Sequence, residues 1–298
     1  MKITAVVVTY NRLELLKKGI ESLRKNKPLT NILVVNNGST DGTHEWLDEQ
    51  KDLLVVHQEN VGGSGGFHRG IKVAYENGAD WIWCMDDDVF PHEDCLEKML
   101  AVANSQQADF LMPRRVIEGK VFTHEFRRFN FSNPFASMKQ GKLGKENIEE
   151  ATAIAGADFE GPMVSREAVE KVGLPNKDFF IFCDDTDYSY RIWKAGFKLY
   201  YVPDALLDKH LFFVSDSWTA RNQKKKWKRY YQVRNTSYLN HHYGENWGVR
   251  YLRSLIGMMG WEILAILSMP FSKAWQWEDL GMLWKAYLDG INEQLGKR

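Results

Sequence analysis

The first 113 residues alternate between short apolar runs and amphipathic segments, and no other feature of the sequence constrains the fold as strongly. The apolar runs are rich in β-branched residues, which is typical of parallel strands buried on both faces, and the segments between them carry apolar residues at helical spacing. This alternation predicts an α/β fold, an open parallel sheet with helices on both faces. The expected strands are Lys2–Thr9, Asn31–Val35, Leu53–His57, Trp81–Met85 and Phe110–Met112, and the expected helices are Arg12–Lys25, Thr43–Gln50, Gly66–Asn77 and Glu93–Asn104.

Polar residues follow four of these expected strands at their carboxyl ends. In open sheets of this kind, ligands bind outside the carboxyl ends of the strands. The sequence therefore predicts a ligand site at this edge of the sheet. The four polar groups are Thr9-Tyr10-Asn11, Asn36-Asn37, Gln58-Glu59-Asn60 and Asp86-Asp87-Asp88.

The three consecutive carboxylates Asp86, Asp87 and Asp88 carry the strongest chemical signal. Adjacent carboxylates repel one another, and keeping them ionised together requires a cation or full solvation. Carboxylate oxygens suit Mg²⁺ or Mn²⁺ ions that bridge to substrate phosphates. A solvated acidic loop that caps the next helix is the alternative, but the position directly after a buried strand favours the cation site.

A second acidic cluster, Asp184-Asp185-Thr186-Asp187, follows the apolar run Phe179–Cys183 and begins an expected helix that ends near Ala195. Such residues cap helices, and we expect at least one of them to do so. A carboxyl group among other carboxylates also has its pKa pushed upward, toward the range of a general base. Both interpretations remain open from the residues alone.

The glycine-rich segment Asn60–Gly70 lies between an expected strand and an expected helix. It matches neither the GxGxxG pattern of dinucleotide-binding folds nor the GK[ST] ending of a P-loop. We interpret it as a loop at a helix N-terminus with Arg69 close by, an arrangement that suits a diphosphate.

Taken in order, the segments TYNR, NNGSTDGT, ENVGGSGGFHRG, DDD and CDDTDYSYR resemble those of family 2 glycosyltransferases of the GT-A fold, over roughly residues 1 to 210. The glycine-rich segment and the DDTDYSYR form are similar to those of bacterial galactofuranosyltransferases and their rhamnosyltransferase relatives. The resemblance implies a Rossmann-like mixed sheet in a catalytic domain, residues 1–215. Its nucleotide-binding half would span 1–113 and its acceptor half 114–215, with a basic, aromatic helical region at 216–298.

The resemblance also implies roles for individual residues. The metal ion, Mn²⁺ or Mg²⁺, would be bound by Asp86, Asp88 and His210, and the catalytic base would be Asp185, with Asp184 as its neighbour. Asn36 and Asn37 stand where many relatives have Asp against the uracil, a departure that leaves the base preference open. The nucleotide sugar would contact Thr9, Tyr10, Asn11, Arg12, Asn37, Asn60, Arg69, Asp86 and Asp87.

The activity implied is a metal-dependent, inverting transfer of a sugar from a nucleotide donor, UDP-galactofuranose by resemblance, to a glycan or lipid-linked glycan acceptor of a bacterial surface polysaccharide. One alternative keeps the fold with dTDP-rhamnose or a UDP-hexopyranose as donor. Another is a catalytically inactive nucleotide-sugar-binding or scaffold protein, against which the intact Asp86, Asp88 and Asp185 argue. The sequence leaves the oligomeric state open.

The C-terminal region differs from the rest in charge. The 39 basic and 39 acidic residues cancel, so bulk charge gives no argument for nucleic acid, but 217–244 holds seven Lys or Arg and no acid. Basic and aromatic side chains together suit an anionic membrane surface or single-stranded nucleic acid, and a packing subdomain is the alternative. Nothing else in the sequence resembles a nucleic-acid-binding module, so no nucleic-acid partner is expected. Arg253 and Glu262 interrupt the apolar run Leu252–Phe271, so no membrane-spanning stretch is expected. Three cysteines without a CxxC pair, and a first apolar run too short for a signal peptide, predict a cytoplasmic protein, peripheral at the inner membrane face.

Overall fold

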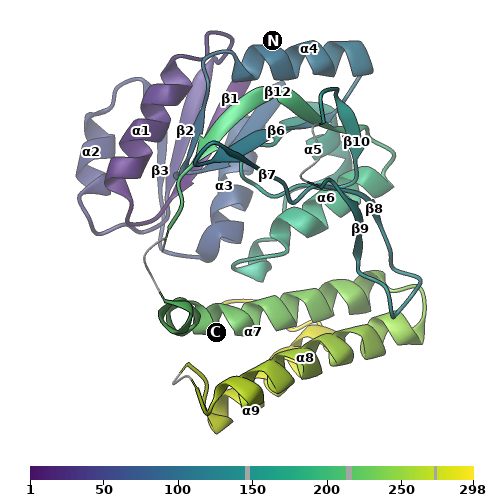
Figure 1. The fold of residues 1–298 in the computed structure, drawn as a ribbon. Helices are drawn as coiled ribbons and strands as arrows, with labels where there is room; N and C mark the ends of the chain where they lie inside the picture. The colour runs from purple at the N-terminus through teal and green to yellow at the C-terminus, as the bar shows by residue number, and fades with distance from the viewer. Residues whose placement is uncertain (145–147, 213–216, 272–273) are drawn as a thin grey trace. The chain divides into compact units, whose positions relative to one another are not determined.

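The computed structural model describes residues 1–144, 148–212, 217–271 and 274–298, and these residues build a ten-stranded mixed sheet (Figure 1). Its strand order is β10-β12-β6-β11-β4-β1-β2-β3, with β5 paired to β12 and β7 to β6. A separate two-stranded sheet is formed by β8 (Phe126–Phe129) and β9 (Lys139–Lys142). The strands of the large sheet are β1 (Ile3–Thr9), β2 (Asn31–Asn36), β3 (Leu53–His57), β4 (Trp81–Asp86), β5 (Val89–Pro91), β6 (Phe110–Ile117), β7 (Lys120–Phe122), β10 (Thr152–Ile154), β11 (Met163–Ser165) and β12 (Leu199–Lys209).

The strands β3, β2, β1 and β4 are parallel neighbours, as the alternation predicted. All seven residues of β1 are buried, because helices cover both faces of this part of the sheet. The short strand β11 lies antiparallel between β4 and β6 and makes the sheet mixed. The Rossmann-like mixed sheet implied by the resemblance is therefore confirmed, whereas a purely parallel sheet is not.

Helices cover the two faces of the large sheet in separate hydrophobic clusters. On one face, α1 (Leu13–Arg24), α2 (Thr43–Glu49) and α4 (Cys95–Gln106) contribute buried residues to the same cluster. On the other face, α3 (Gly62–Glu76), α5 (Arg166–Val172) and α6 (Asp184–Lys194) do so. The bounds of the predicted helices hold to within two residues, except for α3.

Helix α3 begins at Gly62, so the prediction of a glycine-rich loop extending to residue 66 is wrong. Two of the glycines, Gly66 and Gly70, allow the helix to pack closely against β1. A Cβ atom on Gly66 would lie 2.5 Å from Cγ1 of Val8, and one on Gly70 would clash with Val6 of the same strand. Glycines four residues apart therefore let α3 approach β1 closely.

The chain divides into two compact units, and each unit is built from three separate segments of the sequence. Unit 1 comprises residues 1–128, 141–177 and 184–210, and unit 2 comprises 129–140, 178–183 and 211–298. The expected boundary at residue 215 lies outside the described residues. Residues 145–147, shortly after β9, also lie outside them.

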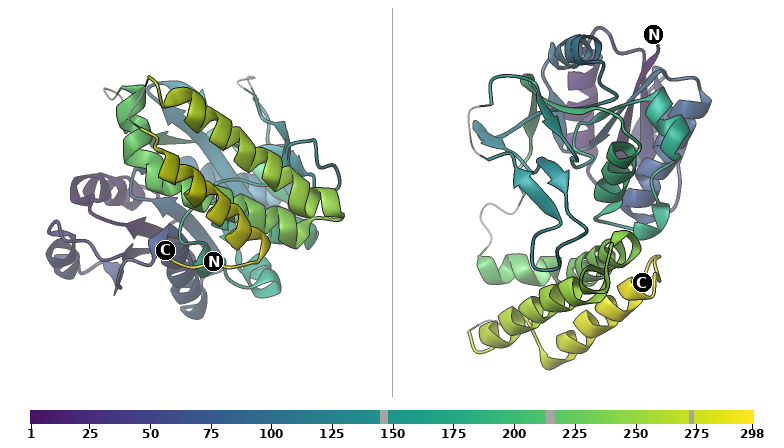
Figure 2. Two further views of the ribbon diagram at one scale, coloured as in Figure 1. Left: turned by 90° about the horizontal axis from the view of Figure 1, so that it is seen from below. Right: turned by 90° about the vertical axis from the view of Figure 1, so that its right-hand side faces the viewer.

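Unit 2 contains α7 (Trp218–Tyr243), a π-helical turn η2 (Gly248–Leu252), α8 (Arg253–Ser268) and α9 (Trp277–Ile291). Helices α8 and α9 pack against each other and against α7 around a hydrophobic core of their own (Figure 2). With η2, α8 forms a 21-residue helix that is long and apolar enough to cross a membrane by length and composition alone. Core helices and helices that lie on a membrane surface share this length and composition with spanning helices.

Candidate active site

The carboxyl ends of β1 and β4 are joined by the side chain of Asp87. Because the two strands are parallel neighbours, their ends meet at the same edge of the sheet. Oδ2 of the buried Asp87 accepts hydrogen bonds from Oγ1 of Thr9 (2.8 Å) and the backbone N of Tyr10 (3.4 Å), and Oδ1 accepts one from Nη1 of Arg12 (2.9 Å). The structure thus brings these four expected residues together, with Asp87 holding the start of the β1–α1 connection.

Asp88 lies among charged groups contributed by three other segments. Its Oδ1 is 3.4 Å from Nζ of Lys209, and its Oδ2 is 3.5 Å from Nη1 of Arg12. The same Lys209 ammonium is 2.7 Å from Oε1 of Glu160. The backbone N of His210 donates to the backbone carbonyl of Asp88 (2.9 Å), so the main chain of His210 pairs with that of Asp88.

The charges around Asp86 do not balance. Burial first, and then the negative charge of Asp88, raises the pKa of Asp86 well above its ordinary value, while Lys209 opposes the rise. When the six carboxylates of this cluster are all ionised, the three cations Arg12, Lys209 and Arg115 leave an excess of three negative charges; the carboxylates are those of Asp86, Asp87, Asp88, Glu125, Asp158 and Glu160. Carboxylate oxygens with that excess fit a divalent cation such as Mg²⁺ or Mn²⁺.

A buried network, whose members Arg115 and Glu160 sequence reasoning missed, extends from this cluster. The guanidinium of Arg115, fully buried on β6, lies 2.5 Å from Oε2 of Glu160, 3.1 Å from Oδ2 of Asp158 and 2.5 Å from Oε1 of Glu125. Asp158 also contacts Nδ1 of His124 (2.7 Å). Buried charges require such pairing, so Arg115 fixes the position of Glu160 beside Lys209.

Asn37 connects the end of β2 to the start of α3. Its buried side-chain oxygen accepts from Nε2 of Gln58 (2.9 Å) and the backbone N of Val61 (3.3 Å). Its Nδ2 donates to the carbonyl of Gly62 (3.0 Å) and to Oδ1 of Asn60 (3.4 Å). The structure therefore brings Asn37 and Asn60 together, and these contacts engage the amide of Asn37 within the protein.

Asn11 and Arg69, two further residues expected to contact the nucleotide sugar, have surroundings different from those of Asn37. The side chain of Asn11, which has a φ of 53°, accepts a hydrogen bond from the backbone N of Thr40 (2.7 Å) and so joins the connections after β1 and β2. Arg69 is exposed on α3, about two helical turns beyond Gly62, because the helix starts earlier than predicted. Arg69 is therefore not adjacent to the helix N-terminus.

Asp184 and Asp185 form the first residues of α6. Burial first, and then the charge of Asp185, raises the pKa of Asp184 to about 8. Asp185 is less buried, and its Oδ1 accepts hydrogen bonds from the backbone N (2.5 Å) and Oγ1 (2.9 Å) of Thr186. The upward shift expected for this cluster falls on Asp184, so near neutral pH the buried member of the pair retains its proton.

His44, Asp48 and His57 form another group of potential metal ligands, at the β3 edge of the sheet. Oδ1 of Asp48 lies 3.2 Å from Nε2 of His57. Asn36 places its Nδ2 3.1 Å from Nδ1 of His57, while its Oδ1 accepts from the backbone N of Ser39. This orientation makes Nδ1 of His57 an acceptor and leaves the proton on Nε2, so the group is engaged in hydrogen bonds.

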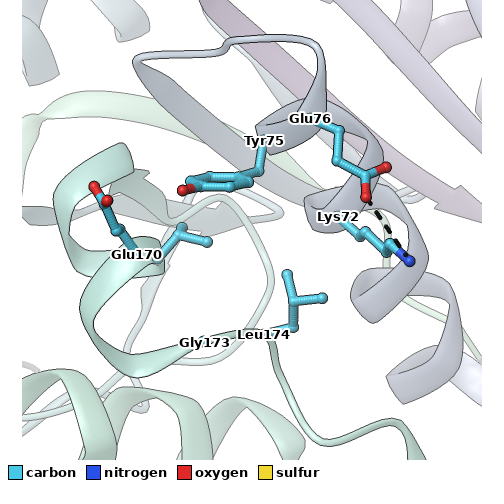
Figure 3. A pocket seen from close by; sticks show the side chains of 7 residues that line it. Lys72, Tyr75, Glu76, Glu170, Gly173 and Leu174 are labelled. Atoms are coloured by element: carbon cyan, nitrogen blue, oxygen red, sulfur yellow. Dashed lines mark ion pairs between the residues drawn. The ribbon is translucent and has the colours of Figure 1, made fainter.

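A pocket of about 310 Å³ lies between α3 and α5 (Figure 3). Tyr75 and Glu76, in its wall, are near the C-terminal end of α3 and shortly precede the start of β4. The pocket is therefore at the amino-end edge of the parallel strands, opposite the cluster around Asp86. Its lining residues are Lys72, Tyr75, Glu76, Val169, Glu170, Gly173 and Leu174.

Comparison with known sequences gives consistent results. The family described as Glycosyl transferase family 2 matches residues 4–173. A galactofuranosyltransferase, GlfT1, of Mycobacterium tuberculosis is 25% identical over 98% of this chain and 96% of that protein. The undecaprenyl-phosphate mannosyltransferase of Micrococcus luteus is 32% identical, with 71% and 86% covered. The dTDP-rhamnosyl transferase RfbF of Shigella flexneri is 26% identical, with 78% of each covered.

Two solved structures share the fold. Staphylococcus aureus TarS, residues 1–349, superimposes with a TM-score of 0.56 over 99% of this chain and 83% of that one, at 13% identity. GalNAc-T7, solved with UDP, GalNAc and Mn²⁺, gives a TM-score of 0.57 at 13% identity. This match covers 80% of this chain and about half, 51%, of that one.

Proposed function

Because this chain belongs to glycosyl transferase family 2 and is a glycosyltransferase of the GT-A fold, we propose that it transfers galactofuranose from UDP-galactofuranose to a glycan acceptor of a bacterial surface polysaccharide. The observation that carries this proposal is the carboxylate cluster at the end of β4, where Asp86, Asp87, Asp88 and Glu160 face Arg12 and Lys209. The third cation there, Arg115, is shared by Glu160 with Asp158 and Glu125. The relative named galactofuranosyltransferase, which aligns over nearly the whole chain, supports the choice of sugar.

The residues at the cluster fit a divalent cation, Mn²⁺ or Mg²⁺, which Asp86, Asp88 and His210 would hold. When bound, such an ion neutralises the charge that develops on the departing diphosphate. Arg12, fixed by Asp87, adds a positive charge at the same edge of the sheet. Thr9, Tyr10 and the segment around Asn60 would orient the nucleotide.

Asp185 is the proposed general base. It would take the proton of an acceptor hydroxyl while that oxygen attacks the anomeric carbon and the bond to the nucleoside diphosphate breaks. One displacement of this kind inverts the anomeric configuration and requires no covalent enzyme intermediate. The buried, protonated Asp184 would leave the negative charge of the pair on Asp185.

The proposed location is the cytoplasmic face of a membrane, with a lipid-linked acceptor. One set of exposed side chains on α8 and α9, here named the apolar face, supports it: Ile256, Met259, Ile263, Leu264, Leu267, Trp277, Trp284 and Leu288. Lys224 and Lys225 on α7 add exposed positive charge in the same unit. Apolar and basic side chains together suit an anionic bilayer surface. The relative named undecaprenyl-phosphate mannosyltransferase supports a polyprenyl-linked acceptor.

A rhamnosyltransferase is the second candidate, favoured by the dTDP-rhamnosyl transferase relative that covers 78% of this chain. The two candidates share the fold and differ in donor. A panel of nucleotide sugars, each tested with Mn²⁺ and with chelator for its effect on the melting temperature, separates them, because a ligand that binds the native state stabilises it. UDP-galactofuranose should give the largest Mn²⁺-dependent increase, and a larger increase with dTDP-rhamnose would reverse the assignment.

The metal ligands are tested in the same assay. Asp88→Ala should abolish the Mn²⁺-dependent stabilisation and most of the activity, and His210→Ala should weaken Mn²⁺ binding less, because it removes a neutral ligand. Activity that persists fully in the presence of chelator would contradict the metal assignment.

A further inference from the structure

The segment directly before the proposed base has an unusual backbone. Phe180, Phe182 and Cys183 have φ values of 66°, 67° and 67°, in the left-handed region that residues other than glycine rarely adopt. Asp184 follows as the first residue of α6. Strained conformations of this kind persist only where the surrounding structure imposes them, and they concentrate at functional sites.

Two buried side chains of α7 hold this segment within unit 2. Nδ2 of Asn235 lies 3.1 Å from the carbonyl oxygen of Phe179, 2.8 Å from that of Ile181 and 2.9 Å from that of Phe182. Nη2 of Arg234 donates to the same Phe179 carbonyl (2.9 Å). Both side chains are at most 1% exposed.

The orientation of both side chains is fixed. Nε of Arg234 donates to Oδ1 of Asn235 (2.8 Å), which turns the NH₂ group of Asn235 toward the segment. Nη1 of Arg234 donates to the carbonyl of Gly296 (2.5 Å), and the backbone N of Gly296 donates to the carbonyl of Asp178 (2.7 Å). Among the ion pairs of the described residues, Arg234 has no carboxylate partner. Its guanidinium therefore binds backbone carbonyls.

Aromatic contacts hold the same segment through its side chains. Phe180 stacks on Tyr231 of α7, with ring centroids 5.0 Å apart, and Phe179 meets Tyr238 edge-on at 5.3 Å. The Arg234 guanidinium itself lies 5.0 Å from the centroid of the Tyr231 ring. The backbone and the side chains of residues 179–182 are thus both fixed by α7.

From these contacts we propose that Arg234 and Asn235 are positioning residues for the transfer reaction. By holding residues 178–183 in place, with Phe180, Phe182 and Cys183 in the left-handed conformation, they fix where α6 begins and how its first carboxylates, Asp184 and Asp185, are oriented. This inference rests on the proposed function, since it takes Asp185 as the base. It also assigns a role in the reaction to α7, which the sequence suggests only as a basic, membrane-binding or packing helix.

The test compares Asn235→Leu with Asn240→Leu. Asn240 is an equally buried amide on the same helix, but it bonds to Oγ of Ser254 (2.9 Å) instead of the segment. Both variants should lower the melting temperature. Only Asn235→Leu should lower kcat for Mn²⁺-dependent UDP release from UDP-galactofuranose, by about tenfold to a hundredfold with KM for the donor nearly unchanged, because misplacing a reacting group by about 1 Å costs on that order. Only that variant should also shift the acidic limb of the pH profile.

Two further measurements keep the inference falsifiable. Amide hydrogen exchange of residues 178–187, which needs no activity, should accelerate in Asn235→Leu and stay unchanged in Asn240→Leu. Adding Cys183→Gly to Asn235→Leu should restore part of kcat, because glycine adopts a φ of 67° without strain. Equal kcat, pH profile and exchange in the two leucine variants would overturn the positioning role. Full activity of Asp185→Asn would instead overturn the proposed base, whatever the outcome for Asn235.

Discussion

Asp185 is the less buried member of the carboxyl pair at the start of α6, and its replacement tests the base directly. Asp185→Asn keeps the shape and the hydrogen bonds from Thr186 but cannot accept a proton. We expect kcat to fall by ~10²–10⁴-fold with donor binding nearly kept. Steady-state kinetics together with a titration of UDP and Mn²⁺ measure the two effects separately. Equal loss in Asp184→Asn, with Asp185→Asn active, would transfer the role to Asp184.

The raised pKa of Asp184 leads to a prediction about the stability of the protein. Its pKa is about 8 in the folded protein and near 3.8 in the unfolded chain, so between these values the folded state binds more protons. The free energy of unfolding therefore falls as the pH rises through this window. Asp184→Asn removes this decrease in stability, because the amide does not titrate. The melting temperature of the variant relative to wild type should increase from about pH 4 to about pH 8 and then level off. The exposed Asp204→Asn is the control, and a pH-independent difference for Asp184→Asn would contradict the expectation.

The residues of the site were predictable where they directly follow strands that lie side by side in the sheet. Thr9, Arg12 and Asp87 meet because β1 and β4 are adjacent and parallel. Glu160 and Arg115 were not predictable, since they lie 45 residues apart and only the fold brings Arg115 to Glu160 and Lys209 to Asp88. Buried charges of this type are indistinguishable in sequence from solvated surface residues.

Among the elements, α3 offers a test of the packing that its glycines allow. A Cβ atom on Gly66 would lie 2.5 Å from Cγ1 of Val8, so Gly66→Ala should destabilise the protein by about 1–3 kcal/mol through overpacking. Gly63→Ala, in the same helix, meets no atom within 4 Å and should stabilise it by up to about 1 kcal/mol through helix propensity. Urea denaturation measures both, and a similar effect of the two substitutions would contradict the close approach of α3 to β1.

The elements themselves were largely predictable because apolar periodicity distinguishes buried strands from amphipathic helices. Helix α3 was misjudged at its start, since glycines usually indicate loops and the close approach to β1 that requires them is a tertiary property. The run Phe179–Cys183 is apolar because it packs against α7, a contact that the sequence does not reveal. Nothing local in the sequence indicates its left-handed residues.

On the scale of the whole molecule, the proposed membrane association would depend on the apolar face of α8 and α9. Replacing Ile263 and Leu267 with Ser should weaken binding to vesicles at any salt concentration, since area-dependent burial is not screened. Replacing Lys224 and Lys225 with Gln should weaken binding to anionic vesicles at low salt only, by on the order of 1 kcal/mol per charge. Lys226 is left unchanged because it pairs with Asp279 at 2.6 Å.

Sedimentation with anionic and neutral vesicles, at low and high salt, measures both contributions to membrane binding. Equal partitioning of wild type and the lysine variant would remove the electrostatic contribution. Wild-type protein that stays in the supernatant with every vesicle would leave α8 and α9 as a packing subdomain.

The interleaving of the two units has a consequence for the order in which the protein is made. Residues 178–183 leave the ribosome before α7, the helix against which Phe179 and Phe180 pack. During synthesis this aromatic run is therefore exposed, in a chain whose sheet strands are already complete, and is available to chaperones or to aggregation. Premature termination before residue 218 would leave residues 178–183 without α7, and we expect such a chain to lack the conformation that orients Asp185, the proposed base.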